Sequence, residues 1–297
     1  MVPAANGLKD SGCLHCYAKD RDDRHLQEPV SHWGKGAARR KSKSAVKDAF
    51  KYNRHPLVCD CGTVAIEAGD TRTSVCPKCQ SGYHRRWIFS LSLGDWLDDE
   101  VPIEWLAEML DTIRQCDQVT WILCTKRPEN WHNRLLRVAT QRSFMGATKF
   151  ASDWLECERG SEYGIPPENI ILLASVENQA MADLRIPQLL KIPAACRGLS
   201  LEPLLGPVNL DPHWLGAGGR SGRNYQQAQI DWLIIGSESG PHRRECKTEW
   251  VRSLVSQGKA AGVATFVKQL QDSEGMVCKD VAEFPSDLQI QEWPAGF

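Results

Sequence analysis

Two closely spaced cysteine pairs carry the strongest chemical signal in the sequence. Fourteen residues separate the pairs, which are Cys59 and Cys61, and Cys76 and Cys79. Two such pairs can supply four thiolates to a tetrahedral zinc ion. Gly62 and Gly82 stand beside them and predict backbone turns under the metal. We therefore predict an S4 zinc site in a zinc-ribbon-like module at 55–86, which needs the metal to fold because it is too short for a core of its own. Four unrelated core thiols are the alternative.

A further Cys-x-x-Cys pair, Cys13 and Cys16, is followed by an aromatic residue, Tyr17. Two thiolates alone complete neither a zinc site nor a cubane iron–sulfur cluster, so the pair is ambiguous. The chain has twelve cysteines, and its first residues lack the layout of a secretory signal. We therefore expect thiols and metal ligands rather than disulfides, and a cytoplasmic location.

Charged side chains stand at the ends of six apolar runs. In chain order they are Asp95, Lys126 and Arg127, Glu177, Glu202, Glu238, and Lys268. Any strand end exposes polar side chains, which explains one or two such cases but not six. In a β/α barrel these ends converge on one mouth, where active sites are built. We predict a polar active or binding site there, with Lys126 and Arg127 as the anion contacts because Arg pairs bidentately with carboxylate or phosphate.

The elements that must position these residues alternate between two patterns. Six runs are apolar nearly throughout, as in strands buried on both faces: 87–93, 119–124, 170–176, 197–201, 231–236 and 264–268. Segments with helical spacing lie between them, at 103–113, 128–139, 178–191 and 248–262. This order predicts an α/β fold with parallel strands, best matched by a (β/α) TIM-type barrel, complete or partial, with the small zinc ribbon inserted. A doubly wound sheet is the main competitor.

Two stretches interrupt the alternation, 141–169 and 216–224, and we interpret both as loops or insertions. Pro187 should kink or restart the helix that contains it. We divide the chain into a cysteine loop and basic irregular segment at 1–54, belonging to the barrel domain, the module at 55–86, and the barrel body at 87–297.

Composition argues against a general affinity for nucleic acid or membranes and leaves a local contact with nucleic acid open. Of 297 residues, 42% are hydrophobic and 25% charged, and the net charge is −1, which is typical of a globular protein without a general affinity for nucleic acid or membrane. No apolar run is long enough to span a bilayer. Locally, residues 35–54 hold eight basic side chains and one acidic. This run and the zinc ribbon are candidate nucleic-acid contacts, although a solvated basic face is as good an interpretation. The sequence identifies no protein partner.

Several long stretches together resemble a phage-associated three-Cys-motif protein family of unknown function, grouped with the radical-SAM-like TIM barrels. They include GCLHCYA, LCTKRPENW, LLASVENQAMADLRIPQLLKIPAACRGLSLEPLLGPV and DWLIIGSESGPHRR. The resemblance covers 11–20 and nearly all of 87–297. It implies a barrel whose first strand leads into a three-cysteine loop holding a [4Fe-4S] cluster, which binds S-adenosylmethionine and cleaves it to a radical. Cys13 and Cys16 match two of the three ligands, and Tyr17 matches the aromatic beside the cluster.

The sequence departs from that pattern because the family's first cysteine, and the strand before it, are missing ahead of Ser11. We expect that the chain begins downstream of the true start, since the other motifs are intact; loss of the cluster is the alternative. The 297 residues alone should bind a cluster poorly. If they form one, His15 or His25 is the nearest candidate for the third ligand.

The resemblance implies a radical-SAM-like phage or prophage protein, and the basic run suggests a nucleic acid or nucleotide as its substrate. An alternative is a non-catalytic, zinc-containing protein with a barrel scaffold and a nucleic-acid-binding or regulatory role. A third hypothesis is a barrel enzyme that uses the mouth carboxylates as acids and bases. No P-loop or dinucleotide-binding glycine motif is present.

Overall fold

The computed structural model describes residues 45–65, 75–90, 94–141, 143–158, 166–216 and 228–297. Cys13, Cys16 and Tyr17 lie outside the described residues, as does most of the basic run. Within the described part, no helix is long and apolar enough to cross a membrane.

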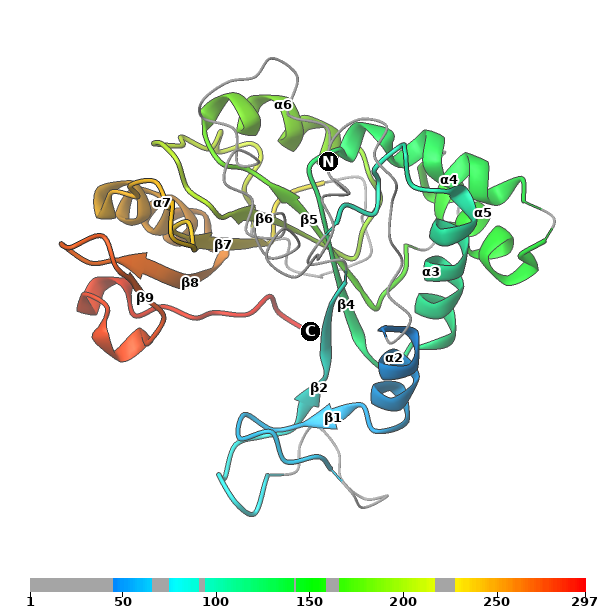
Figure 1. The fold of residues 1–297 in the computed structure, drawn as a ribbon, viewed down its shortest axis with the longest axis horizontal. Coiled ribbons are helices and arrows are strands. Elements are labelled where there is room, and N and C mark those ends of the chain that lie inside the picture. Colours follow the sequence, from blue (N-terminus) through cyan, green and yellow to red (C-terminus); the bar gives the residue numbers. More distant parts are fainter. Residues whose placement is uncertain (1–44, 66–74, 91–93, 142, 159–165, 217–227) are drawn as a thin grey trace, which may run out of the picture.

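A seven-stranded sheet forms the centre of the molecule (Figure 1). Its strands follow one another in chain order: β3 (Trp87–Ser90), β4 (Thr120–Thr125), β5 (Ile170–Ser175), β6 (Cys196–Leu201), β7 (Trp232–Gly236), β8 (Ala264–Gln271) and β9 (Val277–Cys278). All pairs from β3 to β8 are parallel, and β9 is antiparallel to β8. The predicted α/β fold is confirmed, and the unbroken strand order rules out the doubly wound alternative, in which that order reverses.

The sheet curls but does not close within the described residues, where β3 and β9 form its two edges. We call this curled sheet the half-barrel. Strands β3 to β8 all end at the same side of it, which we call the carboxyl edge. A closed TIM barrel is therefore not what the described residues form.

Helices cover the outer face of the half-barrel (Figure 1). They are α3 (Ile103–Gln115), α4 (Trp131–Ala139) after the short 3-10 turn η1 (Pro128–Asn130), α5 (Met145–Glu158), α6 (Gln179–Leu189) and α7 (Thr248–Ala261). Helix α7 ends at a glycine: Gly262 has a φ of 68° and caps the helix. Helix α6 runs through Pro187 and ends two residues later, so the proline does not divide it.

Helix α5 shows that 141–169 is not a loop throughout, and it leaves the other interpretation, an insertion, in place. It packs mainly on α4 and α3 and buries Ala147, Ala151, Trp154 and Leu155, which share one helical face. Two of these four side chains are small, so the apolar stripe is weak in the sequence although its spacing is helical. Packing against α3 and α4, more than the local sequence pattern, therefore determines that this segment is a helix.

Side chains along each strand alternate between two apolar cores. Leu123, Leu172 and Leu233 face the helices, whereas Ile171 and Trp232 face the concave side. The buried Trp232 of that concave core has three aromatic neighbours in the same cluster, Trp87, Phe266 and Phe297.

The C-terminal tail closes the amino-terminal end of the concave side. Its residues pair with β8: the N–H of Glu292 donates to Thr265 and the N–H of Val267 donates to Ile290. The tail's Trp293 ring then lies 5.4 Å from the Trp232 ring, centroid to centroid.

Gly198→Ala should destabilise the half-barrel. Gly198 lies in β6, and a Cβ there would sit 2.7 Å from Cδ2 of Leu173 and 2.8 Å from the backbone oxygen of Trp232. Since backbone in a central strand cannot move aside freely, we expect the free energy of unfolding to fall by about 1–3 kcal/mol, measured by urea denaturation. Gly94→Ala is the control, because nothing lies within 4 Å of its Cβ position. Equal effects of the two changes would contradict this steric argument.

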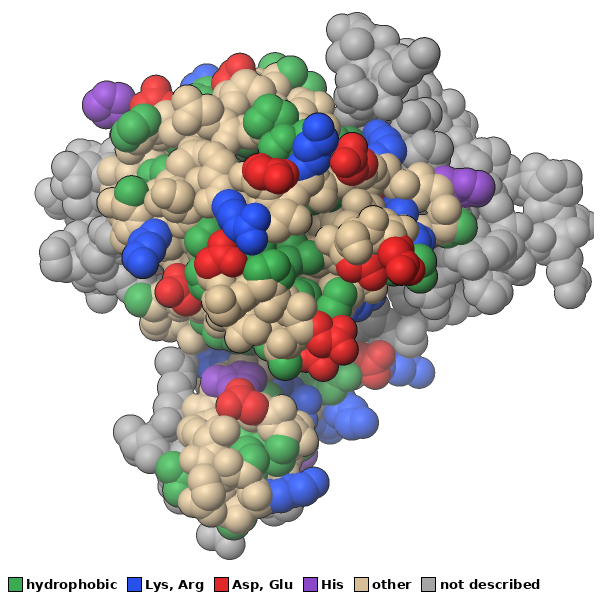
Figure 2. Space-filling view, turned by 90° about the vertical axis from the view of Figure 1, so that its left-hand side faces the viewer, with side chains coloured by type: hydrophobic (Ala, Val, Ile, Leu, Met, Phe, Trp, Pro, Cys, Tyr) green, Lys and Arg blue, Asp and Glu red, His purple; other side chains and the backbone are tan. Residues whose placement is uncertain are grey.

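A small lobe precedes β3. It contains a two-stranded antiparallel sheet of β1 (Leu57–Val58) and β2 (His84–Arg85), and it follows helix α2 (Ala45–Arg54). Figure 2 shows this lobe projecting from the body of the molecule. Its apolar core consists of Cys59, Cys76 and Tyr83 with a few half-buried neighbours. So small a core cannot hold the lobe together by burial alone.

Candidate functional site

The four predicted cysteine ligands come together in the lobe. The sulfur atoms of Cys59, Cys61, Cys76 and Cys79 all lie within 4.8 Å of one another. In a tetrahedral S4 site with Zn–S bonds of about 2.3 Å, neighbouring sulfurs lie about 3.8 Å apart. The cluster can therefore hold a metal ion such as zinc. In the described part of the chain it is the one group of three or more His, Cys, Asp or Glu side chains close enough to do so.

Each cysteine pair ends in a left-handed turn. Gly62, directly after Cys61, has a φ of 80°, as predicted, and its N–H donates to the carbonyl of Cys59 at 2.8 Å. The equivalent residue of the second pair is Gln80, with a φ of 60°. The prediction that Gly82 makes this turn is wrong, because the turn falls directly after the second cysteine of each pair. A glutamine is strained there, so the fold of the lobe must hold it in place.

The surroundings of the thiols differ. Burial, followed by hydrogen bonds from the neighbouring thiols, raises the pKa of Cys59 to about 11. Hydrogen bonds from the backbone N–H groups of Cys79 and Lys78 lower the pKa of Cys76 to about 6, although burial opposes them. The hydroxyl of Thr63 is the main cause of a lowered pKa at Cys61. Two of the four thiols thus favour the thiolate form that a metal ion requires.

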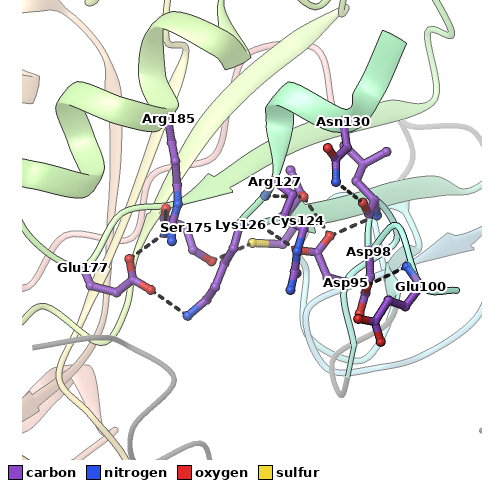
Figure 3. Close-up of polar contacts among 12 residues, drawn as sticks. Asp95, Asp98, Glu100, Cys124, Lys126, Arg127, Asn130, Ser175, Glu177 and Arg185 are labelled. Carbon is purple, nitrogen blue, oxygen red and sulfur yellow. Dashed lines mark hydrogen bonds and ion pairs between the residues drawn. The ribbon is translucent and has the colours of Figure 1, made fainter. Parts of the chain in front are cut away.

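At the carboxyl edge, Asp95 joins the loop after β3 to the end of β4 (Figure 3). Its Oδ1 accepts hydrogen bonds from the hydroxyl of Thr125 at 2.7 Å and the N–H of Leu97 at 3.0 Å. Its Oδ2 accepts from the N–H of Lys126 at 2.8 Å and from Nη1 of Arg127 at 3.1 Å. With four donors, this buried carboxylate acts as a brace between two strand ends.

Glu177, after β5, sits between two cations (Figure 3). Its Oε1 lies 2.6 Å from Nζ of Lys126, and its Oε2 lies 2.6 Å from Nη1 of Arg185. Only 1% of the Glu177 side chain is exposed. Burial pushes the pKa of Glu177 upward, but Lys126 and Arg185 outweigh it and hold the pKa below its ordinary value. The triad links β4, β5 and α6.

Two further ion pairs complete the edge. The Glu238 carboxylate, after β7, accepts three hydrogen bonds from Arg244. They come from Nη2 at 2.6 Å, from Nε at 2.9 Å and from the backbone N–H at 2.8 Å. Nζ of Lys268, in β8, donates to both carboxylate oxygens of Glu202, after β6, at 2.8 Å to Oε2 and 3.1 Å to Oε1. The Glu238 pair is largely buried, whereas 51% of the Lys268 side chain is exposed.

The predicted charged residues therefore share one edge but form separate networks. Glu177 and Glu202 follow neighbouring parallel strands, and the carbonyl of Glu177 accepts the N–H of Leu205 from the loop beyond Glu202. Lys126 and Arg127, the predicted anion contacts, already bind carboxylates of the chain. Their role toward a ligand stays a prediction. A cavity of about 610 Å³ lies elsewhere, at the amino-terminal ends of β6 to β8, and none of these residues lines it.

Arg185 is a residue of the carboxyl-edge network that the strand-end pattern missed. It projects from α6 rather than from a strand end, and its Nη1 also donates to the carbonyl of Ser175 at 2.8 Å. A signal was present in the sequence: Arg185 shares a helical face with the buried residues Ala182, Ile186 and Leu189. An arginine on an apolar helix face indicates a buried acidic partner.

Comparison with known proteins gives a family but no activity. Neither the curated proteins nor the solved structures contain a match. A family model described as "Protein of unknown function (DUF5131)" matches residues 8–284. The match takes in the cysteine cluster, the strands of the half-barrel and every charged residue of the carboxyl edge discussed above. The chain therefore belongs to the DUF5131 family.

Proposed function

We propose that the chain is a radical-SAM-like protein of the phage or prophage group that its sequence resembles, acting on a nucleic acid or nucleotide in the cytoplasm. The observation that carries this proposal is the half-barrel: six parallel strands in chain order, with a charged side chain just beyond each of β4 to β7 and another, Lys268, within β8. In folds of this kind the ligand binds at the carboxyl ends of the strands. We place S-adenosylmethionine at this edge.

The iron–sulfur cluster of that group does not fit the residues present. Cys13 and Cys16 lie outside the described residues and supply two thiolates, whereas a cluster with one open iron takes three. The cysteine cluster that the structure describes lies in the separate lobe. We therefore derive no reaction step through an iron–sulfur cluster.

The described residues support the binding part of this proposal. The braces formed by Asp95, Glu177 and Glu238 fix the strand ends of the edge, because each carboxylate is buried and bonded to at least two donors. Rigid strand ends hold a ligand with little loss of entropy on binding. The lobe contributes a metal centre that we propose to be zinc, with S4 ligation and a structural role.

The proposed function predicts binding without cleavage. The chain should bind S-adenosylmethionine in calorimetry yet form little iron–sulfur chromophore when reconstituted with iron and sulfide without oxygen. A longer version that adds an upstream strand and cysteine should turn brown and release 5′-deoxyadenosine under reduction, because three thiolates then complete the ligand set. Changing Cys16 to serine in that version should abolish both gains. A longer version that stays colourless, or a chain that binds no S-adenosylmethionine, would show the proposal to be wrong.

One observation favours a second candidate function, a non-catalytic nucleic-acid-binding protein. The metal-competent lobe adjoins basic side chains on α2 and β2, among them Lys47, Lys51, Arg54 and Arg85. Basic side chains beside a small metal-bound lobe suit the phosphate backbone of a nucleic acid. Failure to bind S-adenosylmethionine, together with full metal content, would leave this function as the better explanation.

A further inference from the structure

The ion pairs of the carboxyl edge differ in how open they are to exchange. Glu177 and Glu238 are 1% and 5% exposed and hold several partners each. The Glu202–Lys268 pair is different, because the side chains are 18% and 51% exposed. Because the Lys268 side chain of this pair is half exposed, a ligand can take over the partners of this pair at a lower cost than those of the buried pairs. Of these edge pairs, this one is the pair suited to receive a charged ligand.

The backbone beneath this pair is irregular in a way that favours a binding role. Ile235 pairs with Val267, but the next residue of β7, Gly236, pairs with Gln269. Lys268 is therefore the extra residue of a β-bulge. Bulges re-aim side chains and are frequent beside active sites. The regular register would place a different side chain at this point of the edge.

Gly236 allows the pair to form across β7. Glu202 follows β6 and Lys268 belongs to β8, so the two side chains must meet over the strand between them. A Cβ on Gly236 would lie 3.3 Å from Cγ of Glu202 and 3.2 Å from Cγ of Gln269. The missing side chain leaves the space in which Glu202 approaches Lys268.

We infer that Glu202 and Lys268 form a recognition site for the head group of an α-amino acid. A ligand ammonium replaces Lys268 at the Glu202 carboxylate, while the ligand carboxylate pairs with the Lys268 amine. A purely anionic ligand would leave the mostly buried Glu202 without a cation, and a zwitterion leaves neither charge unpaired. This inference deepens the proposed function and rests on it, since S-adenosylmethionine carries such a head group.

The test compares two ligands that differ in the amino-acid head group and the one methylene that joins it to the thioether. S-adenosylhomocysteine carries the amino-acid head, and 5′-methylthioadenosine has the same nucleoside and thioether without it. In calorimetry with the full chain, we expect S-adenosylhomocysteine to bind about ten- to hundredfold more tightly, as two charge-assisted contacts imply. Glu202→Gln and Lys268→Met should each remove most of this preference and leave binding of 5′-methylthioadenosine unchanged.

Lys149→Met is the matched control, because it removes a lysine from another exposed ion pair, with Asp153 on α5. It should change neither affinity. Unaltered thermal unfolding of the two edge variants would show that they are folded. Equal binding of both ligands, or a preference that survives both edge variants, overturns this inference and leaves the proposed function standing. If neither ligand binds, the inference is overturned, and if S-adenosylmethionine does not bind either, the proposed function is wrong as well.

Discussion

Replacing Cys76 with serine is expected to release the metal ion from the lobe and to loosen the lobe, while the half-barrel stays folded. Cys76 is fully buried and supplies one of the four sulfurs of the cluster, and its backbone N–H donates to the carbonyl of Ser81 across the second turn. The lobe has two strands of two residues each and a core built around the cysteines themselves. Metal binding must therefore supply most of its folding free energy.

Elemental analysis should find zinc in the unaltered chain and almost none in Cys76→Ser. Hydrogen exchange should accelerate in 57–65 and 75–86 and stay slow in the half-barrel strands, because the lobe is a separate unit of stability. Cys278→Ser is the control: Cys278 lies in β9, far from the cluster, and bonds to Glu283. Full metal content in Cys76→Ser, or loss of the whole fold, would contradict the expectation.

The second large effect is expected at Glu177. Glu177→Gln removes the negative charge between Lys126 and Arg185 and leaves their positive charges facing each other across a buried amide. Breaking a buried ion pair from one side costs about 3–5 kcal/mol of the free energy of unfolding. Urea denaturation at pH 7 measures this loss. Asp153→Asn, in an exposed pair with Lys149, should cost less than about 1 kcal/mol.

Glu177 should also make the free energy of unfolding fall as the solution becomes acidic. The folded-state pKa of Glu177 is lowered, so its stabilising contribution is present above the unfolded pKa of about 4.3 and is lost as pH falls through the lower folded pKa. Glu177→Gln cannot be protonated. The variant should therefore lose less stability than the unaltered chain between pH 5 and the acid transition. If the free energy of unfolding falls equally with decreasing pH in the two proteins, Glu177 does not titrate in this way.

The sequence predicts the strands well because β4, β5 and β7 are buried on both faces, which leaves runs of apolar residues that few other elements produce. It also places Glu177 and Glu202 at one edge, since parallel strands in chain order end together. It does not reveal which charges pair. Arg185 reaches Glu177 from a helix, and Lys268 reaches Glu202 because of a bulge. Both depend on side-chain reach and strand register, which residue types alone do not encode.

Helix α5 and the turn at Gln80 illustrate the same limit. The burial of α5 arises from contact with α3 and α4, so its weak apolar stripe acquires meaning only in the packed protein. Gln80 adopts a left-handed conformation because the cysteine pair before it must curl around the cluster. In both places the surrounding structure overrides the local preference of the residues.

The pairing of the tail with β8 has a consequence for synthesis on the ribosome. The amino-terminal half of the concave core is finished only when Ile290 and Glu292 bond to β8 and Trp293 packs on Trp232. Translation adds about 5–20 residues per second, and domains start to fold while they are being made. The nascent half-barrel therefore leaves the exit tunnel with Trp232 and Phe266 uncovered on this side, and chaperones have access to these rings until residues 290–293 emerge.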